Sequence, residues 1–420
     1  MTSDTRQTHT RSKVILLAGI LLFAANLRAP FTSIAPLLET LKQTFDLSAT
    51  QAGLLITLPL LSFSAVSPFA AGVARKLGLE RALFLALGIV AMGIAVRSGG
   101  HVALLYIGTA IIGSGIAIGN VLLPSLLKRD FPQHVAALTA VYVLTMGIAA
   151  ASASALAVPL AHLAGFDWRL VAAAALVLQA VAAVAWLPQL SRGAAAPSAA
   201  TAESSSRALW RSPLAWQVTL FLGLDCFLYY VGVSWLPAIL RDGGYSAEQA
   251  GSFHGVLLLA TAFPGLLLIP LVPRLRDQRA LAVVLSLSMS VGLAGLLLAP
   301  KWAMLWILCF GFGAGGGLIL ALAFISLRTS GAGQAAALSG MAQCVGYLLA
   351  AAGPPLVGLL HDRSGHWAVP LLLCVTVGVL MAAVGLFAGR SVRVGEGVAL
   401  TPRPSPGGRG ERIQINARSV

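Results

Sequence analysis

The chain has 420 residues, of which 58% are hydrophobic and only 10% are charged, a composition that excludes a soluble globular protein. Its formal net charge of +14 could indicate a nucleic-acid partner, but the basic residues are spread over short loops between apolar segments. The four cysteines lie within apolar segments without paired spacing, so neither a disulfide framework nor a metal site is indicated. We expect a membrane protein that uses no cofactor and binds no nucleic acid.

Runs of about 20 apolar residues follow one another along the chain, and each is long enough to cross the hydrocarbon core of a bilayer. The runs lack the alternation typical of strands, and lipid leaves no backbone group unpaired, so they predict helices. We therefore expect an all-α membrane protein with twelve transmembrane helices. Their centres lie near residues 26, 62, 90, 114, 147, 178, 225, 261, 290, 315, 347 and 378.

The second half of the chain repeats parts of the first half at an offset of 198 residues. The hexamer at residues 48–53 recurs at 246–251, and Arg81-Ala-Leu83 recurs at Arg279-Ala-Leu281. Six predicted spans fall in each half, which indicates a duplicated six-helix unit of the kind found in transporters with parallel repeats. Glycines recur at the same offset, and we expect them to allow close helix packing, with a hinge as the alternative. They are Gly113, Gly115 and Gly119, and Gly311, Gly313 and Gly317.

Composition also marks the predicted boundaries of these units. The segment between the halves is rich in Ala, Ser and Arg, as in a flexible linker, and the end of the chain is rich in Pro, Gly and Arg. The expected parts are an N-terminal segment (1–13), a first six-helix bundle (14–188), a linker (189–212), a second bundle (213–388) and a disordered tail (389–420).

Lysine and arginine are distributed unequally between the two sides of the predicted membrane. With the N-terminus inside, 21 of them fall on the cytoplasmic side, six fall outside, and Arg28 alone lies within a span. This asymmetry is the positive-inside pattern, which predicts that both termini are cytoplasmic. We expect a monomeric, multi-pass protein of the bacterial inner (plasma) membrane, with the lipid bilayer and a small-molecule substrate as its partners.

Two charged residues fall deep within predicted spans, Arg28 in the first and Asp225 in the seventh. Charges at this depth are costly, so they indicate a functional site. Because the first and seventh spans correspond across the repeat, we expect the two residues to face one central path. Arg28 is suited to bind a planar anion, and Asp225 is a candidate proton carrier. The alternative is a structural ion pair between them.

Other polar residues within the spans complete the candidate site. Thr32 and Tyr229 each lie one helical turn beyond a charged residue and share its helix face. His254 can titrate near neutrality and is a second candidate for proton coupling, although a structural hydrogen bond is the alternative. Any of these side chains could instead tie helices together. The remaining candidates for substrate binding are Asn120, Gln343 and Tyr347.

The repeat, the twelve spans and the linker together resemble the major facilitator superfamily over residues 14–388. Within it, four stretches resemble the bacterial cyanate and 2-nitroimidazole transporter family. They are Asn26-Leu-Arg-Ala-Pro30, Gly119-Asn-Val-Leu-Leu-Pro124, Trp235-Leu-Pro-Ala-Ile-Leu-Arg-Asp242, and Ser339-Gly-Met-Ala-Gln343 followed by Gly358-Leu-Leu-His-Asp362. The resemblance implies transport by alternating access, with the substrate near Arg28.

Two positions depart from the pattern of these relatives. The superfamily's loop between helices two and three usually reads G-x-x-x-D-R-x-G-R-R, whereas here Arg75 stands where Asp is usual. The resemblance implies that Arg75, Lys76, Gly78 and Arg81 form a gating loop with an altered interaction. A glutamine commonly occupies the position of Asp225 in the relatives, which implies a different substrate or coupling ion here.

The sequence thus predicts a secondary transporter, and not an enzyme, that moves a small anion or planar weak acid such as cyanate or a nitroheterocycle. Protons are a candidate coupling ion. One alternative is an exporter of hydrophobic drugs in which Arg28 pairs permanently with Asp225. A second alternative is a membrane sensor that does not transport, although the lack of a sizeable soluble domain disfavours it.

Overall fold

A computed structural model describes residues 3–34, 37–47, 49–162, 168–191 and 208–395, and every regular element in these ranges is a helix. Most of the predicted linker and tail lies outside them. The longer helices are α1 (Ser3–Asn26), α4 (Ala49–Leu77), α5 (Leu79–Arg97), α6 (Val102–Asp130), α7 (Val135–His162), α8 (Trp168–Trp186), α10 (Pro213–Asp242), α11 (Ala247–Ala260), α13 (Arg279–Leu298), α14 (Ala303–Leu327), α15 (Ala332–Ser364) and α16 (Ala368–Ala388). The shorter ones are α2 (Ala29–Thr32), α3 (Leu38–Phe45), η3 (Leu187–Gln189), α12 (Phe263–Leu271), η4 (Val272–Arg274) and η5 (Pro300–Trp302).

The lengths of these helices match the predicted membrane spans. Among the described residues, eleven helical stretches are long and apolar enough to cross a membrane, and Ala174–Gln189 is a shorter apolar one. This shorter stretch corresponds to the sixth predicted span, centred near residue 178. Two spans combine consecutive helices: Val14–Thr32 covers α1 and α2, and Gln249–Leu268 covers α11 and α12. The all-α membrane fold predicted from the sequence is confirmed.

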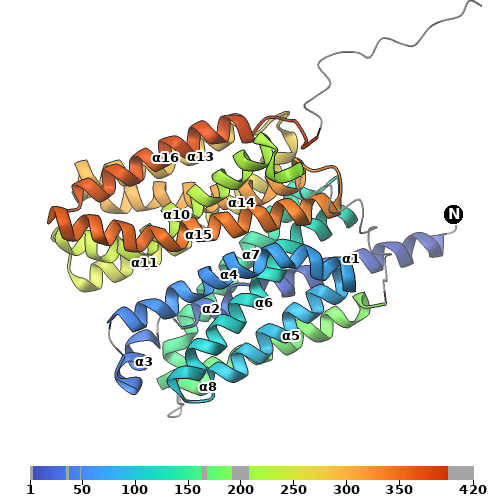
Figure 1. The fold of residues 1–420 in the computed structure, drawn as a ribbon, viewed down its shortest axis with the longest axis horizontal. Helices are drawn as coiled ribbons and strands as arrows, with labels where there is room; N and C mark the ends of the chain where they lie inside the picture. The colour runs from blue at the N-terminus through green and yellow to red at the C-terminus, as the bar shows by residue number, and fades with distance from the viewer. Residues whose placement is uncertain (1–2, 35–36, 48, 163–167, 192–207, 396–420) are drawn as a thin grey trace, which may run out of the picture.

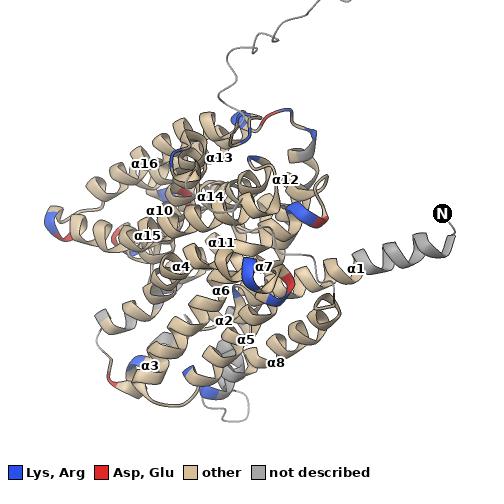
Figure 2. Cartoon of the chain, turned by 45° about the vertical axis from the view of Figure 1, so that its right-hand side comes forward, with Lys and Arg blue, Asp and Glu red and all other residues tan. Residues whose placement is uncertain are grey.

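The helices form two groups, α1–α8 and α10–α16, which lie side by side with their long axes roughly parallel (Figure 1). Helix α1 begins and helix α16 ends at the same end of the molecule (Figure 1). We call this the terminal end. Charged residues gather mainly at the ends of helices, and long stretches between them carry none (Figure 2). This is the charge distribution that burial in lipid requires.

The repeated glycines occupy equivalent places in the two groups. In α6, a Cβ atom at Gly113 would meet Pro59 of α4 at 3.1 Å, and one at Gly115 would meet the Ala86 carbonyl of α5 at 2.8 Å. Helix α14 repeats this arrangement, because Gly311 faces α11 and Gly313 faces α13. Each glycine therefore allows two helices to approach closely, as the packing interpretation predicted.

The two groups touch from the middle of the membrane to the terminal end. The hydroxyl of Ser326 donates to the Pro124 carbonyl (3.0 Å), which joins the last turns of α14 and α6. Nearer the centre, the hydroxyl of Ser64 on α4 donates to the Cys344 carbonyl on α15 (2.8 Å). A Cβ atom at Gly340 would lie 2.9 Å from the Ser67 carbonyl, so α15 and α4 also pack closely between these levels.

Candidate functional site

The first membrane helix is broken where Arg28 stands. Proline at position 30 has no N–H to donate to the Asn26 carbonyl, so the helix cannot continue through this point. Helix α1 ends at Asn26, and Arg28 precedes α2 with φ −124° and ψ −40°. The Arg28 carbonyl accepts hydrogen bonds from the amides of Phe31 (3.1 Å) and Thr32 (3.0 Å). Arg28 and α2 therefore form one unit.

Arg28 and Asp225 line the same cavity, which lies between the two groups of helices. The cavity has an empty volume of ≈ 540 Å³, part of which is open to solvent. Its apolar wall includes Val143, Met146 and Leu318. Its polar wall consists of Arg28, Asp225, Cys226, Tyr229, Tyr230, Thr261 and Tyr347.

The guanidinium of Arg28 reaches across the interface between the groups. Its Nη1 donates to the hydroxyl of Tyr229 on α10 (3.4 Å), and its Cζ lies 5.6 Å from the centroid of the same ring. No other protein partner of this guanidinium is present in the described part of the chain. A partly buried cation with unused donors on a cavity wall can bind an anion or a polar oxygen.

Asp225 lies on the same wall without an ion-pair partner. Its side chain is buried, with 1% exposed, and its Oδ1 has no hydrogen-bond partner among the described residues. Oδ1 packs directly against the main chain of Gly317, where a Cβ atom would overlap it. Within the described chain, no ion pair joins Asp225 to Arg28. The cavity wall therefore carries a cation and a carboxyl group that are not joined to each other by an ion pair or a hydrogen bond.

Two further predicted residues, Tyr229 and Tyr347, also line this cavity. The ring of Tyr347 packs on Phe63 of α4, with centroids 4.8 Å apart, so it too spans the two groups. Sequence reasoning missed Tyr230 and Cys226, which follow Tyr229 and Asp225 directly and also face the cavity. Their position next to Asp225 and Tyr229 in the sequence could have indicated them. Polarity alone did not separate them from the other weakly polar residues of the spans.

The other predicted site residues do not line the cavity. Thr32 donates to the carbonyls of its own turn and to that of Ala150 on α7 (3.2 Å), so it ties helices together. The amide of Gln343 donates to the Ser339 hydroxyl (2.9 Å), and a ring nitrogen of His254 lies 3.1 Å from the Val233 carbonyl. Asn120 is partly buried on α6, away from the cavity wall.

The sequence profile described as Major Facilitator Superfamily matches residues 15–351. The chain belongs to the major facilitator superfamily. It is 52% identical to the 2-nitroimidazole transporter of Escherichia coli (strain K12) over 91% of this chain and 98% of that protein. It is 28% identical to the cyanate transport protein CynX of the same organism, over 87% of this chain and 95% of the relative. The resemblance seen in the sequence is thereby confirmed.

A solved structure of the proton:xylose symporter XylE, bound to 6-bromo-6-deoxy-D-glucose, has the same fold. The two superpose with a TM-score of 0.73 at 15% sequence identity, covering 92% of this chain and 98% of that one. The family match, the 52% identical relative and the eleven apolar helices of the described chain make this facilitator a multi-pass membrane transporter of a small molecule and not an enzyme.

The predicted gating loop of this facilitator joins α4 to α5 at the terminal end. Arg75 and Lys76 close α4, and Gly78 adopts φ +85°, a left-handed conformation that favours glycine. Arg81 lies in the first turns of α5. Sequence reasoning missed Glu80 in this loop, which is 4% exposed and pairs with Arg129 of α6 (2.5 Å). Its signal was an acidic residue in an otherwise basic loop.

Arg97 is the last residue of α5 and one of the six basic residues predicted to lie outside. In the structure its side chain is buried, with 1% exposed, and its Nη1 donates to the Pro30 carbonyl (2.7 Å). A residue at a helix end can turn its side chain inward, and hydropathy does not record that direction.

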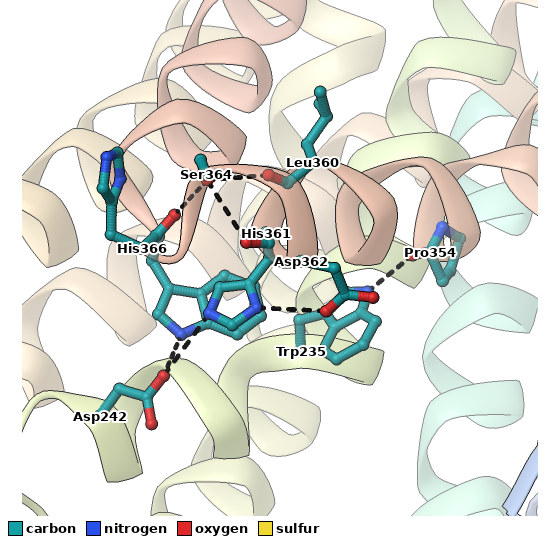
Figure 3. Close-up of polar contacts among 9 residues, drawn as sticks. Trp235, Asp242, Pro354, Leu360, His361, Asp362, Ser364 and His366 are labelled. Atoms are coloured by element: carbon teal, nitrogen blue, oxygen red, sulfur yellow. Dashed lines mark hydrogen bonds and ion pairs between the residues drawn. The ribbon is translucent and has the colours of Figure 1, made fainter.

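Two of the stretches that resemble the cyanate and 2-nitroimidazole transporter family meet at the end of this facilitator away from the termini (Figure 3). Asp242 at the end of α10 accepts a hydrogen bond from the indole of Trp367 (2.6 Å) and lies 3.8 Å from a ring nitrogen of His361. The rings of His361 and Trp367 are stacked, with centroids 4.1 Å apart. Trp235 donates to the Pro354 carbonyl (2.8 Å). We call Asp242, His361 and Trp367 the outer cluster.

Proposed function

We propose that this facilitator moves a small planar anion or weak acid, of the size of cyanate or 2-nitroimidazole, through the cavity lined by Arg28 and Asp225. The observation that carries the proposal is the guanidinium on a cavity wall between the two halves, with one protein hydrogen bond and no carboxylate partner. The name of the 52% identical relative, a 2-nitroimidazole transporter, supports the same class of solute.

In the proposed mechanism, Arg28 binds an oxygen or the negative charge of the solute, and the tyrosines of the polar wall contact its ring. The halves then rock about the cavity to expose it to each side in turn. The hydrogen bond from Arg28 to Tyr229 links residues of opposite halves, so a solute that competes for this guanidinium would loosen one contact between them. Binding would then be coupled to motion.

Asp225 supplies the second recognition element. Its carboxyl group lies on the same wall, so it can accept an N–H or O–H from the solute or carry a proton across. A permanent Arg28–Asp225 ion pair, the premise of the drug-exporter alternative, is absent between these two described residues. We propose proton coupling through Asp225, and we regard His254 as the weaker candidate because it lies off the cavity.

The distribution of basic residues supports an orientation with both termini in the cytoplasm. We propose that the protein is a monomer in the bacterial inner membrane. The terminal end of the helices would then be the cytoplasmic end.

Reconstitution into liposomes tests the proposal. Wild-type protein should accumulate at least one of three labelled solutes, 2-nitroimidazole, cyanate and benzoate. Arg28→Ala should reduce that uptake by about ten- to a hundredfold, the effect of losing a charge-assisted hydrogen bond. Arg241→Ala, at an exposed position at the end of α10, is the matched control and should retain wild-type uptake. Equal uptake by the Arg28→Ala and wild-type proteins would rule out the anion site.

An imposed pH gradient tests the coupling. Uptake by the wild-type protein should rise with an inward proton gradient, whereas uptake by Asp225→Asn should not respond to it. A wild-type rate that is indifferent to the gradient would exclude proton coupling while leaving the Arg28 site intact.

A further inference from the structure

Arg97 is a buried cation outside the cavity wall. It ends α5, and a Cβ atom at Gly108 of α6 would overlap its main chain, so the two helices approach closely at this point. Its Nη1 donates to the Pro30 carbonyl at 2.7 Å. The Nε and Nη2 atoms are buried and have no hydrogen-bond partner among the described residues.

Keeping this guanidinium buried is unfavourable, because a buried charge loses its hydration and two of its donor atoms gain nothing in return. The only hydrogen bond that this group makes to the described protein is the one to Pro30. A methionine or leucine would fill the same space without that cost. The interaction with the Pro30 carbonyl is therefore the feature that an arginine adds here.

The Pro30 carbonyl belongs to the broken part of the first membrane helix. Helix α2 has four residues, too few to hold its own conformation. Among the described residues, the only other donor to this carbonyl is the Ser33 hydroxyl, through a long hydrogen bond (3.3 Å). On its other side, α2 is tied to α7 through Thr32 and the Ala150 carbonyl. Arg97 thus fixes the side of α2 that faces α5.

We infer that Arg97 is a positioning residue for Arg28. Pro30 is two residues beyond Arg28, and the Arg28 carbonyl is bonded to the amides of α2, so the two segments are held as one unit. By fixing α2, Arg97 sets the direction in which the Arg28 guanidinium enters the cavity and reaches Tyr229. This inference rests on the proposed role of Arg28 in binding the transported solute.

Uptake kinetics of the solute that the wild-type protein transports best among 2-nitroimidazole, cyanate and benzoate provide the first test. Arg97→Met should raise KM for that solute by about tenfold, since a displacement of the order of 1 Å in a binding group has effects of this size or larger. Arg97→Lys, which can still donate to the Pro30 carbonyl, should recover part of the loss.

Arg328→Met is the matched control. Arg328 is also buried, with 3% exposed, and its Nε donates to the Ala388 carbonyl (2.9 Å), but it lies at the terminal end. The same chemical change there should leave KM unaltered. In addition, the KM effect of Arg97→Met should vanish when Arg28 is already alanine, because residues that act through one another are not additive. Additive effects, or an equal effect of Arg328→Met, would overturn the inference.

A second measurement does not depend on transport. In the absence of solute, Arg97→Met should accelerate hydrogen exchange at the amides of Phe31, Thr32 and Ser33, while exchange in α7 stays at the wild-type rate. Unchanged exchange at these three amides would overturn the inference, whatever the uptake results. If the wild-type protein takes up none of the three solutes but exchange at α2 does respond, the proposed substrate class fails and the anchoring of α2 by Arg97 stands.

Discussion

The two halves of this facilitator share their packing but differ in what stands at one equivalent position. In α6, a Cβ atom at Gly119 would meet the side chain of Leu27 at 2.6 Å. In α14, the equivalent Gly317 faces Asp225, and 225 is 27 plus the repeat offset of 198. The glycine therefore preserves the same space in both halves, and that space holds a leucine in one and a carboxyl group in the other. Duplication kept the geometry of the helices and changed the chemistry.

The terminal end shows a second difference of this kind. In the first half, Glu80 forms an ion pair with Arg129, and the indole of Trp186 donates to the Glu80 carbonyl (3.0 Å). In the second half, Gln278 takes the place of the acid and accepts a hydrogen bond from Arg328 (2.5 Å). Both contacts join the start of one helix to the end of the next. Both halves place an arginine against a side-chain oxygen at this point, but the oxygen belongs to a carboxylate in the first half and to a neutral amide in the second.

The largest loss of stability is expected at a position where the second half cannot accept the residue of the first half. Gly315 faces the carbonyl of Thr261, which the break between α11 and α12 turns toward α14. Its equivalent in the first half is Ala117, beside the unbroken α4. Gly315→Ala should lower the free energy of unfolding by about 3 kcal/mol or more, because a main-chain atom cannot move aside as a side chain can. Thermal unfolding in detergent, followed by circular dichroism, measures the change.

Gly251→Ala in α11 is the control for that experiment, since a Cβ atom there would meet nothing within 4 Å. It should leave the unfolding temperature unchanged or slightly raised, because alanine favours a helix over glycine. A Gly315→Ala protein as stable as Gly251→Ala would show that α14 and α11 are not tightly packed.

A smaller effect is expected from removing the acid of the first half. Glu80→Leu leaves Arg129 with Asp130 as its remaining acidic partner and should destabilise the protein by about 2 kcal/mol. Glu80→Gln copies the second half and should cost less than half as much, because the amide oxygen still accepts a hydrogen bond from Arg129. The same unfolding assay measures both variants. Equal losses would mean that the charge, and not the shared geometry, stabilises this contact.

In the first half, Thr44 stands at the position of Asp242 of the outer cluster. Trp367→Phe removes the hydrogen bond to Asp242 but keeps an aromatic ring beside His361. We expect a loss of about 1 kcal/mol in unfolding free energy, the usual contribution of one hydrogen bond. Trp302→Phe, at an exposed tryptophan, is the control and should have no effect. A loss of equal size in both variants would remove the structural role of the indole N–H.

The smallest change is expected to be a gain. Burial lowers the pKa of Arg328 to about 10, and Asp277 opposes this effect. Gln278→Glu would give the guanidinium a carboxylate partner like that of Arg129 and should stabilise the protein by up to about 1 kcal/mol. The gain should change little in high salt, because both positions are buried and salt screens buried pairs weakly. A loss of stability would show that the second half cannot accommodate the charge pattern of the first.

The sequence predicted the fold because long apolar runs are rare outside membrane spans. It also singled out Arg28 and Asp225, which line one cavity in the structure. Long apolar runs gave the spans, and Arg28 and Asp225 stood out as isolated charges within them. Thr32, Gln343 and His254 bond to other protein groups and do not line the cavity. Residue order does not show whether a polar side of a helix faces a cavity or a neighbouring helix. The buried states of Arg97 and Glu80 depend on how side chains turn at helix ends, which residue order does not record.

The spaces preserved at Gly119 and Gly317 have a consequence for how such a protein diversifies. A duplicated gene encodes two equivalent spaces, one beside each of these glycines. The side chain that fills either space can be replaced by a single substitution without moving a helix. Selectivity can therefore drift in one half while the other half keeps the fold intact. In this chain the space beside Gly317 holds the Asp225 carboxyl group, and the space beside Gly119 holds the Leu27 side chain.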